Sequence, residues 1–213
     1  MKRIIALIDS VVSKGDKHPE IKEIKKVGEL NVPTGKIVVC DPLVEPEIEP
    51  IIKDFPKGKF PVYLYYSHEE DCIAFAELRF SEAPVQRWEM ALVDDQDMKE
   101  LEENEIFGYA VDSSLGCFMD IEGQKAMLKH EMELSDQLGD KFTSYYDNYI
   151  DNLFFGPGAV DEYYCEVKPY DNNPNNVIIF QAGYGEGFYG TYIGYDKDGK
   201  IAKLFTDFNI LEE

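Results

Sequence analysis

The sequence contains few cysteines, and no two of them are close together. The four are Cys40, Cys72, Cys117 and Cys165, and no CxxC pair occurs. The lack of such a pair argues against the zinc-ribbon and thioredoxin motifs, in which two residues separate the paired cysteines. Each cysteine lies in an apolar or strand-like run, as buried free thiols commonly do. Free thiols are typical of a reducing compartment, so we expect a cytoplasmic protein.

A long apolar segment is also missing. At the N-terminus, Lys2-Arg3 precedes only residues 4–8 before Asp9 interrupts the apolar run. This run is too short for the apolar core of a signal peptide, and no later run reaches the about 18 residues of a membrane-spanning helix. We therefore expect a soluble protein without a membrane partner.

Positive charge is scarce. The 213 residues include 21 Lys and Arg against 42 Asp and Glu, which gives a formal net charge of −21. Residues 1–40 carry +3 (8 basic, 5 acidic), so residues 41–213 carry −24 (13 basic, 37 acidic). Such an acidic body repels nucleic acid and anionic membranes, and we expect neither as a partner. It suits a basic protein or a cation, or it serves solubility alone.

Familiar catalytic signatures are absent. The sequence has no GxSxG, HExxH or P-loop motif, and its only histidines are His18, His68 and His130. Cys117 would need a nearby base to act as a nucleophile. His18 and His68 fall in expected loops, and His130 falls in a charged helical stretch that we expect to be exposed. The sequence leans towards a non-enzymatic protein and leaves an enzyme open.

The hydrophobic pattern predicts an α+β fold with a largely antiparallel β-sheet. Alternating or apolar runs predict strands near residues 60–66, 71–80, 84–93, 177–182, 188–195 and 201–207, joined in part by links short enough for hairpins. Two helices are expected within residues 121–154, where apolar residues recur at helical spacing. Residues 1–30, slightly basic and partly amphipathic, are expected to form a helical appendage to a single domain at 31–213.

The last 37 residues carry the clearest local pattern. Asp198-Gly199 separates two apolar and aromatic runs and predicts a β-hairpin with a type I′ turn. We expect strand 177–182 in the same sheet. The glycine-rich corner at residues 183–187 precedes a strand and not a helix, which argues against a dinucleotide-binding loop. The segment from Asp196 also fails as a calcium loop, because Lys200 and Ile201 occupy its fifth and sixth positions.

Four carboxylates are the candidate catalytic or cation-binding residues: Asp112, Asp120, Glu186 and Asp207. If the 112–120 stretch met the glycine corner, these groups would form a cluster able to bind a hard cation or to exchange protons. The alternative is that Asp112 caps a turn and Asp120 caps the following helix. No cofactor and no metal site of recognisable spacing are predicted, although the cluster would admit a divalent cation.

Aromatic side chains are the candidate binding residues. They are Trp88, the sole tryptophan, and three tyrosines of the last two runs, Tyr184, Tyr189 and Tyr192. The alternative for Trp88, at the centre of an expected strand, is a place in the core.

Several separated motifs resemble the bacterial family called domain of unknown function 4241. They are Pro33-x-Gly35, Cys40-Asp41-Pro42, Arg87-Trp88-Glu89, the stretch from Val111-Asp112 to Asp120, and a closing group of Tyr189, Tyr192, Gly194, Asp196, Gly199 and Asp207-Phe208. The resemblance covers roughly residues 28–211. Glu186 stands where the family pattern has Asp within Gly-Asp-Gly, and this longer carboxylate would place its oxygens differently. The resemblance implies no established activity.

Three functions are consistent with the sequence. The first is an acidic protein-binding module, of the immunity or inhibitor kind, that meets a basic partner, because complementary charge speeds association. The second is a cation-assisted hydrolase that uses the four carboxylates. The third is a purely structural or interaction domain.

Overall fold

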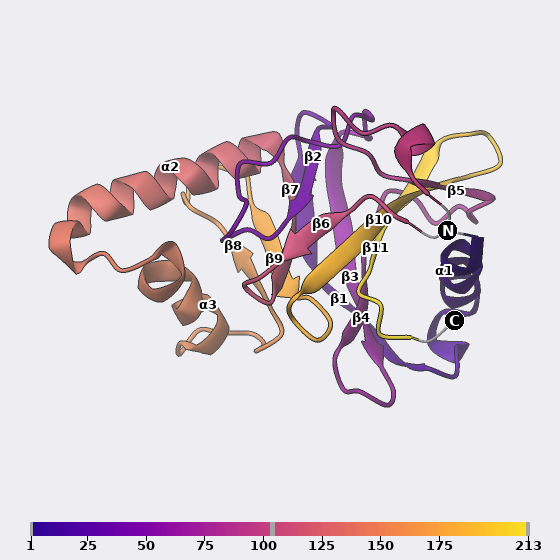
Figure 1. The fold of residues 1–213 in the computed structure, drawn as a ribbon. Coiled ribbons are helices and arrows are strands. Elements are labelled where there is room, and N and C mark those ends of the chain that lie inside the picture. The colour runs from indigo at the N-terminus through magenta and orange to yellow at the C-terminus, as the bar shows by residue number, and fades with distance from the viewer. Residues whose placement is uncertain (1, 103–104, 212–213) are drawn as a thin grey trace.

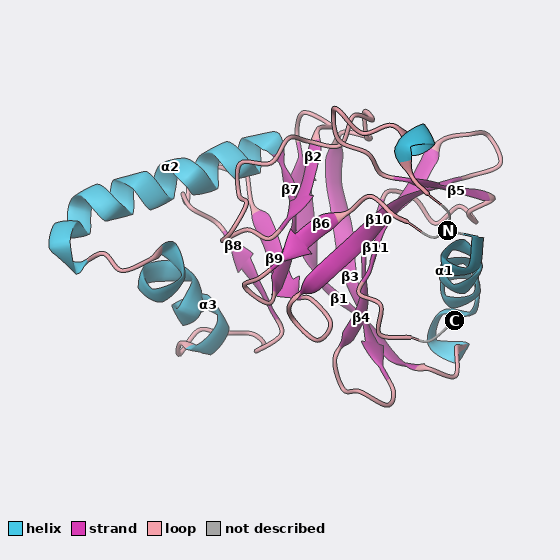
Figure 2. Ribbon diagram, viewed as in Figure 1, coloured by secondary structure: helices cyan, strands magenta, loops and turns pink. Residues whose placement is uncertain are grey.

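The computed structural model describes residues 2–102 and 105–211. Within these residues the chain forms a seven-stranded and a four-stranded sheet, and every strand pairing is antiparallel. The two sheets lie between helix α1 on one side and helices α2 and α3 on the other (Figure 1). The predicted α+β class with largely antiparallel sheet is therefore confirmed, and Figure 2 shows how strands dominate the centre.

The larger sheet has the strand order β1-β3-β4-β11-β10-β5, with β6 also paired to β10. Its strands are β1 (Ile21–Val32), β3 (Gly58–Ser67), β4 (Ile73–Arg79), β5 (Arg87–Met90), β6 (Tyr109–Val111), β10 (Gly187–Tyr195) and β11 (Ile201–Asp207). The C-terminal hairpin β10–β11 thus lies at the centre of the sheet, between strands from the first half of the chain.

The smaller sheet has the order β2-β7-β9-β8 and separates two hydrophobic clusters. Its strands are β2 (Ile37–Cys40), β7 (Leu115–Asp120), β8 (Tyr164–Val167) and β9 (Val177–Gln181). Alternate side chains of a strand point to opposite faces. In β9, Ile178 and Phe180 join the larger cluster, shared with the larger sheet, whereas Val177 and Ile179 join the cluster beneath α2 and α3. Both faces of this sheet are therefore buried.

Helices cover the outer faces. Helix α1 (Lys2–Lys14) buries Ile8 and Val11, and the Trp88 Nε1–H on β5 donates to Asp9 Oδ1 of this helix (3.5 Å). Three short 3₁₀ segments are Gly15–Lys17, Met98–Glu100 and Gly139–Lys141. Helix α1 covers the face of the double sheet opposite to α2 and α3 (Figure 1).

The two helices expected within residues 121–154 are present. Helix α2 (Ile121–Leu138) ends at Gly139, whose φ of +54° suits glycine. A π-helical segment (Tyr146–Ile150) runs directly into α3 (Asp151–Phe155). Met127, Ile150 and Phe154 bury their side chains against the smaller sheet. No helix within the described ranges combines the length and apolar character that a membrane span requires.

Residues 1–30 contain both a helix and a strand. Helix α1 forms the first half, and residues 21–32 form β1, which pairs with β3 along its length. The boundary expected at residue 30 therefore lies inside a strand of the larger sheet. The mixed charges of β1 obscured its pattern, since only Ile21, Leu30 and Val32 are fully buried.

Two sheet assignments were wrong. Strand β9 belongs to the smaller sheet and not to that of the C-terminal hairpin. Strands β4 and β5, joined by a short link, do not form a hairpin, because β11 and β10 lie between them. The β10–β11 hairpin itself is confirmed, but not its type I′ turn. A type I′ turn needs positive φ at both central residues. Gly199 has φ +75°, but Asp198 does not have positive φ. The Asp196 carbonyl accepts from the N–H of Gly199 (3.0 Å).

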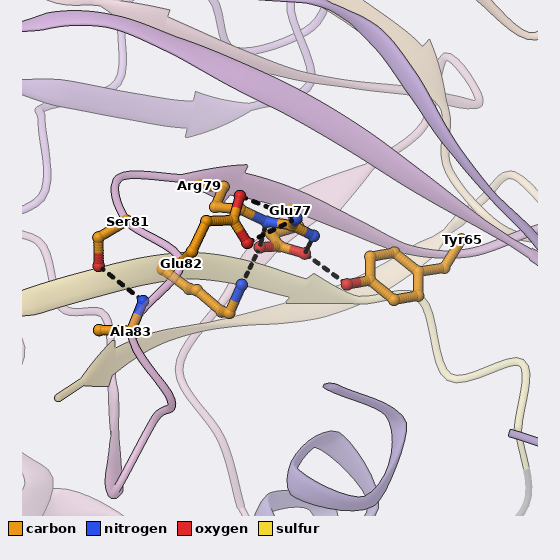
Figure 3. A network of polar contacts seen from close by, with 7 residues as sticks. Tyr65, Glu77, Arg79, Ser81, Glu82 and Ala83 are labelled. Carbon is orange, nitrogen blue, oxygen red and sulfur yellow. Dashed lines mark hydrogen bonds and ion pairs between the residues drawn. The ribbon is translucent and has the colours of Figure 1, made fainter. Parts of the chain in front are cut away.

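A buried ionic group ties three central strands together on the face towards α1 (Figure 3). Glu77 on β4 is fully buried, and its Oε1 accepts from Lys203 Nζ of β11 (2.5 Å) and from Arg79 Nε (2.7 Å). Its Oε2 accepts from Arg79 Nη2 (3.0 Å) and from the Tyr65 hydroxyl of β3. Burial would raise the pKa of Glu77, but Arg79 and Lys203 outweigh that effect and hold the pKa below its ordinary value.

Candidate functional site

The 112–120 stretch and the glycine corner meet in space, which was the condition set for a shared site. The Ala182 N–H donates to the Ser114 carbonyl (3.0 Å), and Gly187 pairs with Val111 between β10 and β6. Ser114 Oγ lies 2.7 Å from the position that a Cβ on Gly185 would take, so no side chain fits there. Glycine is therefore needed at residue 185 both for this approach and for its φ of +105°.

The four candidate carboxylates do not share one environment. Asp120 is fully buried, and Asp207 is 3% exposed and accepts from the Asn209 N–H (2.8 Å). Asp112 and Glu186 are exposed. Among the described residues, no three His, Cys, Asp or Glu side chains are grouped so that they could hold a metal ion. The geometry therefore does not assemble the predicted cation-binding cluster.

Asp120 caps helix α2, as the alternative interpretation proposed. Its Oδ1 accepts from the Glu122 N–H (3.0 Å), and its Oδ2 accepts from the Thr34 N–H (3.1 Å) and hydroxyl (2.8 Å). One side chain thus begins the helix and fixes the turn before β2. This arrangement accounts for a buried carboxylate without any catalytic role.

We expect Asp120→Ala to lower the free energy of unfolding by about 1–2 kcal/mol, because a buried cap is lost. Asp120→Asn should lower stability less than Asp120→Ala, because Asn still caps the helix, although its NH2 group cannot accept from the Thr34 N–H. Urea denaturation of both variants measures the difference. Equal losses for Ala and Asn would show that the charge matters more than the cap.

Asp41 is a structural anchor that the sequence interpretation missed. It is fully buried, and its Oδ2 accepts from the N–H groups of Asp112 (3.0 Å) and Ser113 (2.8 Å). Its Oδ1 accepts from the Ser113 hydroxyl (2.7 Å) and from two N–H groups of its own loop, Leu43 (2.9 Å) and Val44 (3.2 Å). The available signal was its place: an acid directly after a buried strand and before Pro42.

A pocket of about 610 Å³ lies where the loop, the corner and helix α3 meet. Tyr184 of the corner and Phe155 of α3 form part of its wall and are 66% and 59% exposed. Ser113 and Ser114 contribute from the loop that Asp41 anchors. The volume is within the range of small-molecule sites, about 300–1,000 Å³. We call this space the corner pocket.

The backbone around the corner pocket is irregular on three sides. Ser114 has φ +67°, which few residues other than glycine adopt, and Gly183 and Gly185 also have positive φ. The π-helical segment supplies Tyr146 to the wall. Single π turns and strained residues occur frequently at functional sites. The corner pocket is therefore the best candidate site in the described part of the chain.

Of the aromatic binding candidates, only Tyr184 lines the corner pocket. Trp88 is 7% exposed and packs on Phe205, so it belongs to the core. Tyr192 is fully buried. Tyr189 is 4% exposed, and its hydroxyl donates to the Gly185 carbonyl (3.0 Å), which supports the corner from within.

We expected His130 to be exposed, but it is half-buried. Three tyrosine rings surround it, Tyr145, Tyr149 and Tyr170, with centroids 4.6–5.7 Å away. Its Nδ1 lies 2.8 Å from the Tyr145 hydroxyl, and burial lowers the pKa of His130. The sequence signal was the helical spacing of Tyr145 and Tyr149, which brings both rings to one face.

Comparison with known proteins gives a family but no characterised relative. No curated protein matches the chain, and no solved structure does. The family model described as "Protein of unknown function (DUF4241)" matches residues 30–206, which include the anchor at Asp41, the 112–120 stretch and the glycine corner. The match extends over most of the chain, which therefore belongs to the DUF4241 family.

Proposed function

We propose that the protein is a non-enzymatic binding module, of the immunity or inhibitor kind, whose partner is a basic protein in the cytoplasm. One observation carries the proposal: two loops rich in exposed acids lie side by side. The first, residues 45–49, exposes Glu45, Glu47 and Glu49. The second, residues 94–105, exposes six further acids among its described residues: Asp94, Asp95, Asp97, Glu100, Glu102 and Glu105. We call these two segments the acidic loops.

Backbone contacts hold the acidic loops next to each other. The Ile52 N–H, just beyond the first loop, donates to the Leu92 carbonyl just before the second (2.9 Å). Ile48 of the first loop and Gln96 of the second line one small cavity. Lys99 is the only basic residue within the two loops, and it lies 3.8 Å from Asp97. The surface therefore keeps a large excess of negative charge.

Such a surface favours a partner with clustered Lys and Arg. Complementary charge raises the association rate at low salt and suppresses acidic competitors. At physiological ionic strength the Debye length is about 8 Å, so added salt weakens this attraction. The cytoplasmic part of the proposal is supported by four free cysteines, among them Cys40 and Cys117, whose sulfurs lie 3.7 Å apart in a hydrogen bond and not in a disulfide.

We expect the immobilised protein to retain a basic protein from lysate of its native cells at low salt, and to release it at about 1 M salt, where the Debye length falls to about 3 Å. A variant in which five of the nine exposed acids are neutral should retain clearly less of that protein. It carries E45Q, E47Q, E49Q, D94N and D95N. Calorimetric titration of the purified partner then measures the loss of affinity.

A matched control removes the same charge elsewhere. It carries E69Q, E70Q, D136N, D140N and D171N, all at exposed positions. This control should retain the partner, because the net charge changes equally in both variants. If both variants lost the partner equally, net charge alone and not the acidic loops would explain the binding. If the unmodified protein retained no basic protein, the proposed function would be contradicted.

A further inference from the structure

The corner pocket has an aromatic wall in a highly charged protein. Four aromatic side chains line it: Tyr146, Phe154, Phe155 and Tyr184. Leu43 and Leu115 add aliphatic surface, and no charged side chain of the described residues is part of the lining. Charged residues make up 30% of the sequence, so an uncharged lining favours an apolar, ring-shaped ligand over a charged group in the interior.

Polar groups in the same wall can orient such a ligand. Ser113 and Gln181 are held in place, since the Ser113 hydroxyl donates to Asp41 and Gln181 Nε2 donates to the Glu162 carbonyl (3.1 Å). Ser114 Oγ lies at the close approach to Gly185 and lines the pocket with them. A few fixed polar groups in a largely apolar cavity are typical of small-molecule sites.

Two acidic residues are the direct sequence neighbours of residues that line the pocket. Asp112 precedes the lining residue Ser113, and Glu186 follows the lining residue Gly185. Both carboxylates are exposed, in a protein with a net charge of −21. A ligand with a positive group at its outer end is attracted to these carboxylates, whereas an anion is repelled.

We propose that the corner pocket binds a small aromatic cation, with the ring among the four aromatic side chains and the positive group near Asp112 and Glu186. Cation–aromatic contact with the exposed Tyr184 ring adds to the attraction. This site is separate from the acidic loops, which contribute no residue to the lining. In this proposal Asp112 and Glu186, two members of the predicted carboxylate cluster, attract the ligand and do not bind a metal.

Three probes of equal ring size test the proposal: phenethylamine, phenethyl alcohol and phenylacetate. Ligand-observed NMR titration should give the order amine, alcohol, acid, with the amine bound at least about tenfold more tightly than the acid. The double variant D112N/E186Q should bind amine and alcohol about equally. Anion binding equal to amine binding, or no binding of any probe, would overturn the proposal.

Wall variants locate the bound ring. Phe155→Ala combined with Tyr184→Ala should weaken amine binding at least about tenfold, because both rings line the pocket. Phe188→Ala is the matched control, since Phe188 is 48% exposed beside the same corner and is not part of the lining. Equal binding by the wall variant and the control would place the amine elsewhere and refute the site.

The two proposals fail separately. The variant with five neutralised loop acids should bind phenethylamine as the unmodified protein does, although it retains less of the basic partner. If the wall variant loses the basic partner while no free amine binds the unmodified protein, the pocket receives a side chain of that partner. That result would overturn the small-molecule proposal.

Discussion

Replacing Glu77 by glutamine should lower the free energy of unfolding by about 3–5 kcal/mol, because the change leaves Lys203 buried without its counter-charge. Lys203 is 6% exposed, so water cannot solvate most of its side chain in place of Glu77. For a domain of this size, each kcal/mol shifts Tm by about 2–4 °C, so we expect a fall of about 10 °C. Thermal unfolding followed by circular dichroism measures it.

Glu82 provides the matched control. It also faces Arg79, at 3.3 Å, but its side chain is 79% exposed, so Glu82→Ala should change stability by no more than about 0.5 kcal/mol. The double variant E77L/K203M should recover only part of the loss, because no lysine remains unpaired but Arg79 and the Tyr65 hydroxyl still lose Glu77 as acceptor. Equal stability of E77Q and E82A would contradict the role given to this group.

The same carboxylate makes stability depend on pH. The folded-state pKa of Glu77 lies below its ordinary value, so its contribution is present above the unfolded-state pKa of about 4.3 and is lost as pH falls through the folded-state pKa. The acid-induced loss of stability should therefore be smaller in E77Q than in the unmodified protein. Urea midpoints between neutral and acidic pH measure the difference.

Replacing Asp41 by alanine should cost about 3 kcal/mol or more, because it removes the acceptor of four backbone N–H groups and one hydroxyl, and a buried unpaired donor costs about 1–3 kcal/mol. Loss of these hydrogen bonds also releases the loop that holds Ser113 and Ser114, which line the corner pocket. Binding of phenethylamine should weaken together with stability.

The Asp112→Ala variant is the control for Asp41→Ala, because it removes an acid whose N–H, and not its carboxylate, takes part in the Asp41 anchor. Asp112 is exposed and takes part through its N–H, so its side chain should be worth no more than about 0.5 kcal/mol. Unfolding in urea compares the two variants. A larger loss of stability in D112A than in D41A would reverse the assignment of the anchor.

Local patterns predicted the elements of the fold well, and they failed where partners come from distant segments. The β10–β11 hairpin and helix α2 follow from a turn pair and from helical spacing, which are contained within a few residues. Strand β9 precedes the hairpin closely, yet it pairs with β7 and β8 in the other sheet. Membership of a sheet depends on non-local packing, which a single strand pattern does not contain.

The sequence posed a contact between the 112–120 stretch and the glycine corner as a condition for a shared site, and the structure shows that contact. It named Asp120 and Asp207 as candidate reactive groups and gave helix capping as the alternative for Asp120; both carboxylates accept hydrogen bonds from backbone N–H groups two residues further along the chain. Asp41 was passed over because its partners lie about 70 residues away, and sequence spacing cannot show that contact.

The strand order also bears on how the chain folds as it leaves the ribosome. Strands β10 and β11 are made last but occupy the middle of the larger sheet, between β4 and β5. Until residue 207 has emerged, β4 and β5 have unpaired edges, and Glu77 has no Lys203 to pair with. Exposed strand edges invite pairing with other chains. The larger sheet is therefore open to pairing with other chains until β10 and β11 close the gap between β4 and β5.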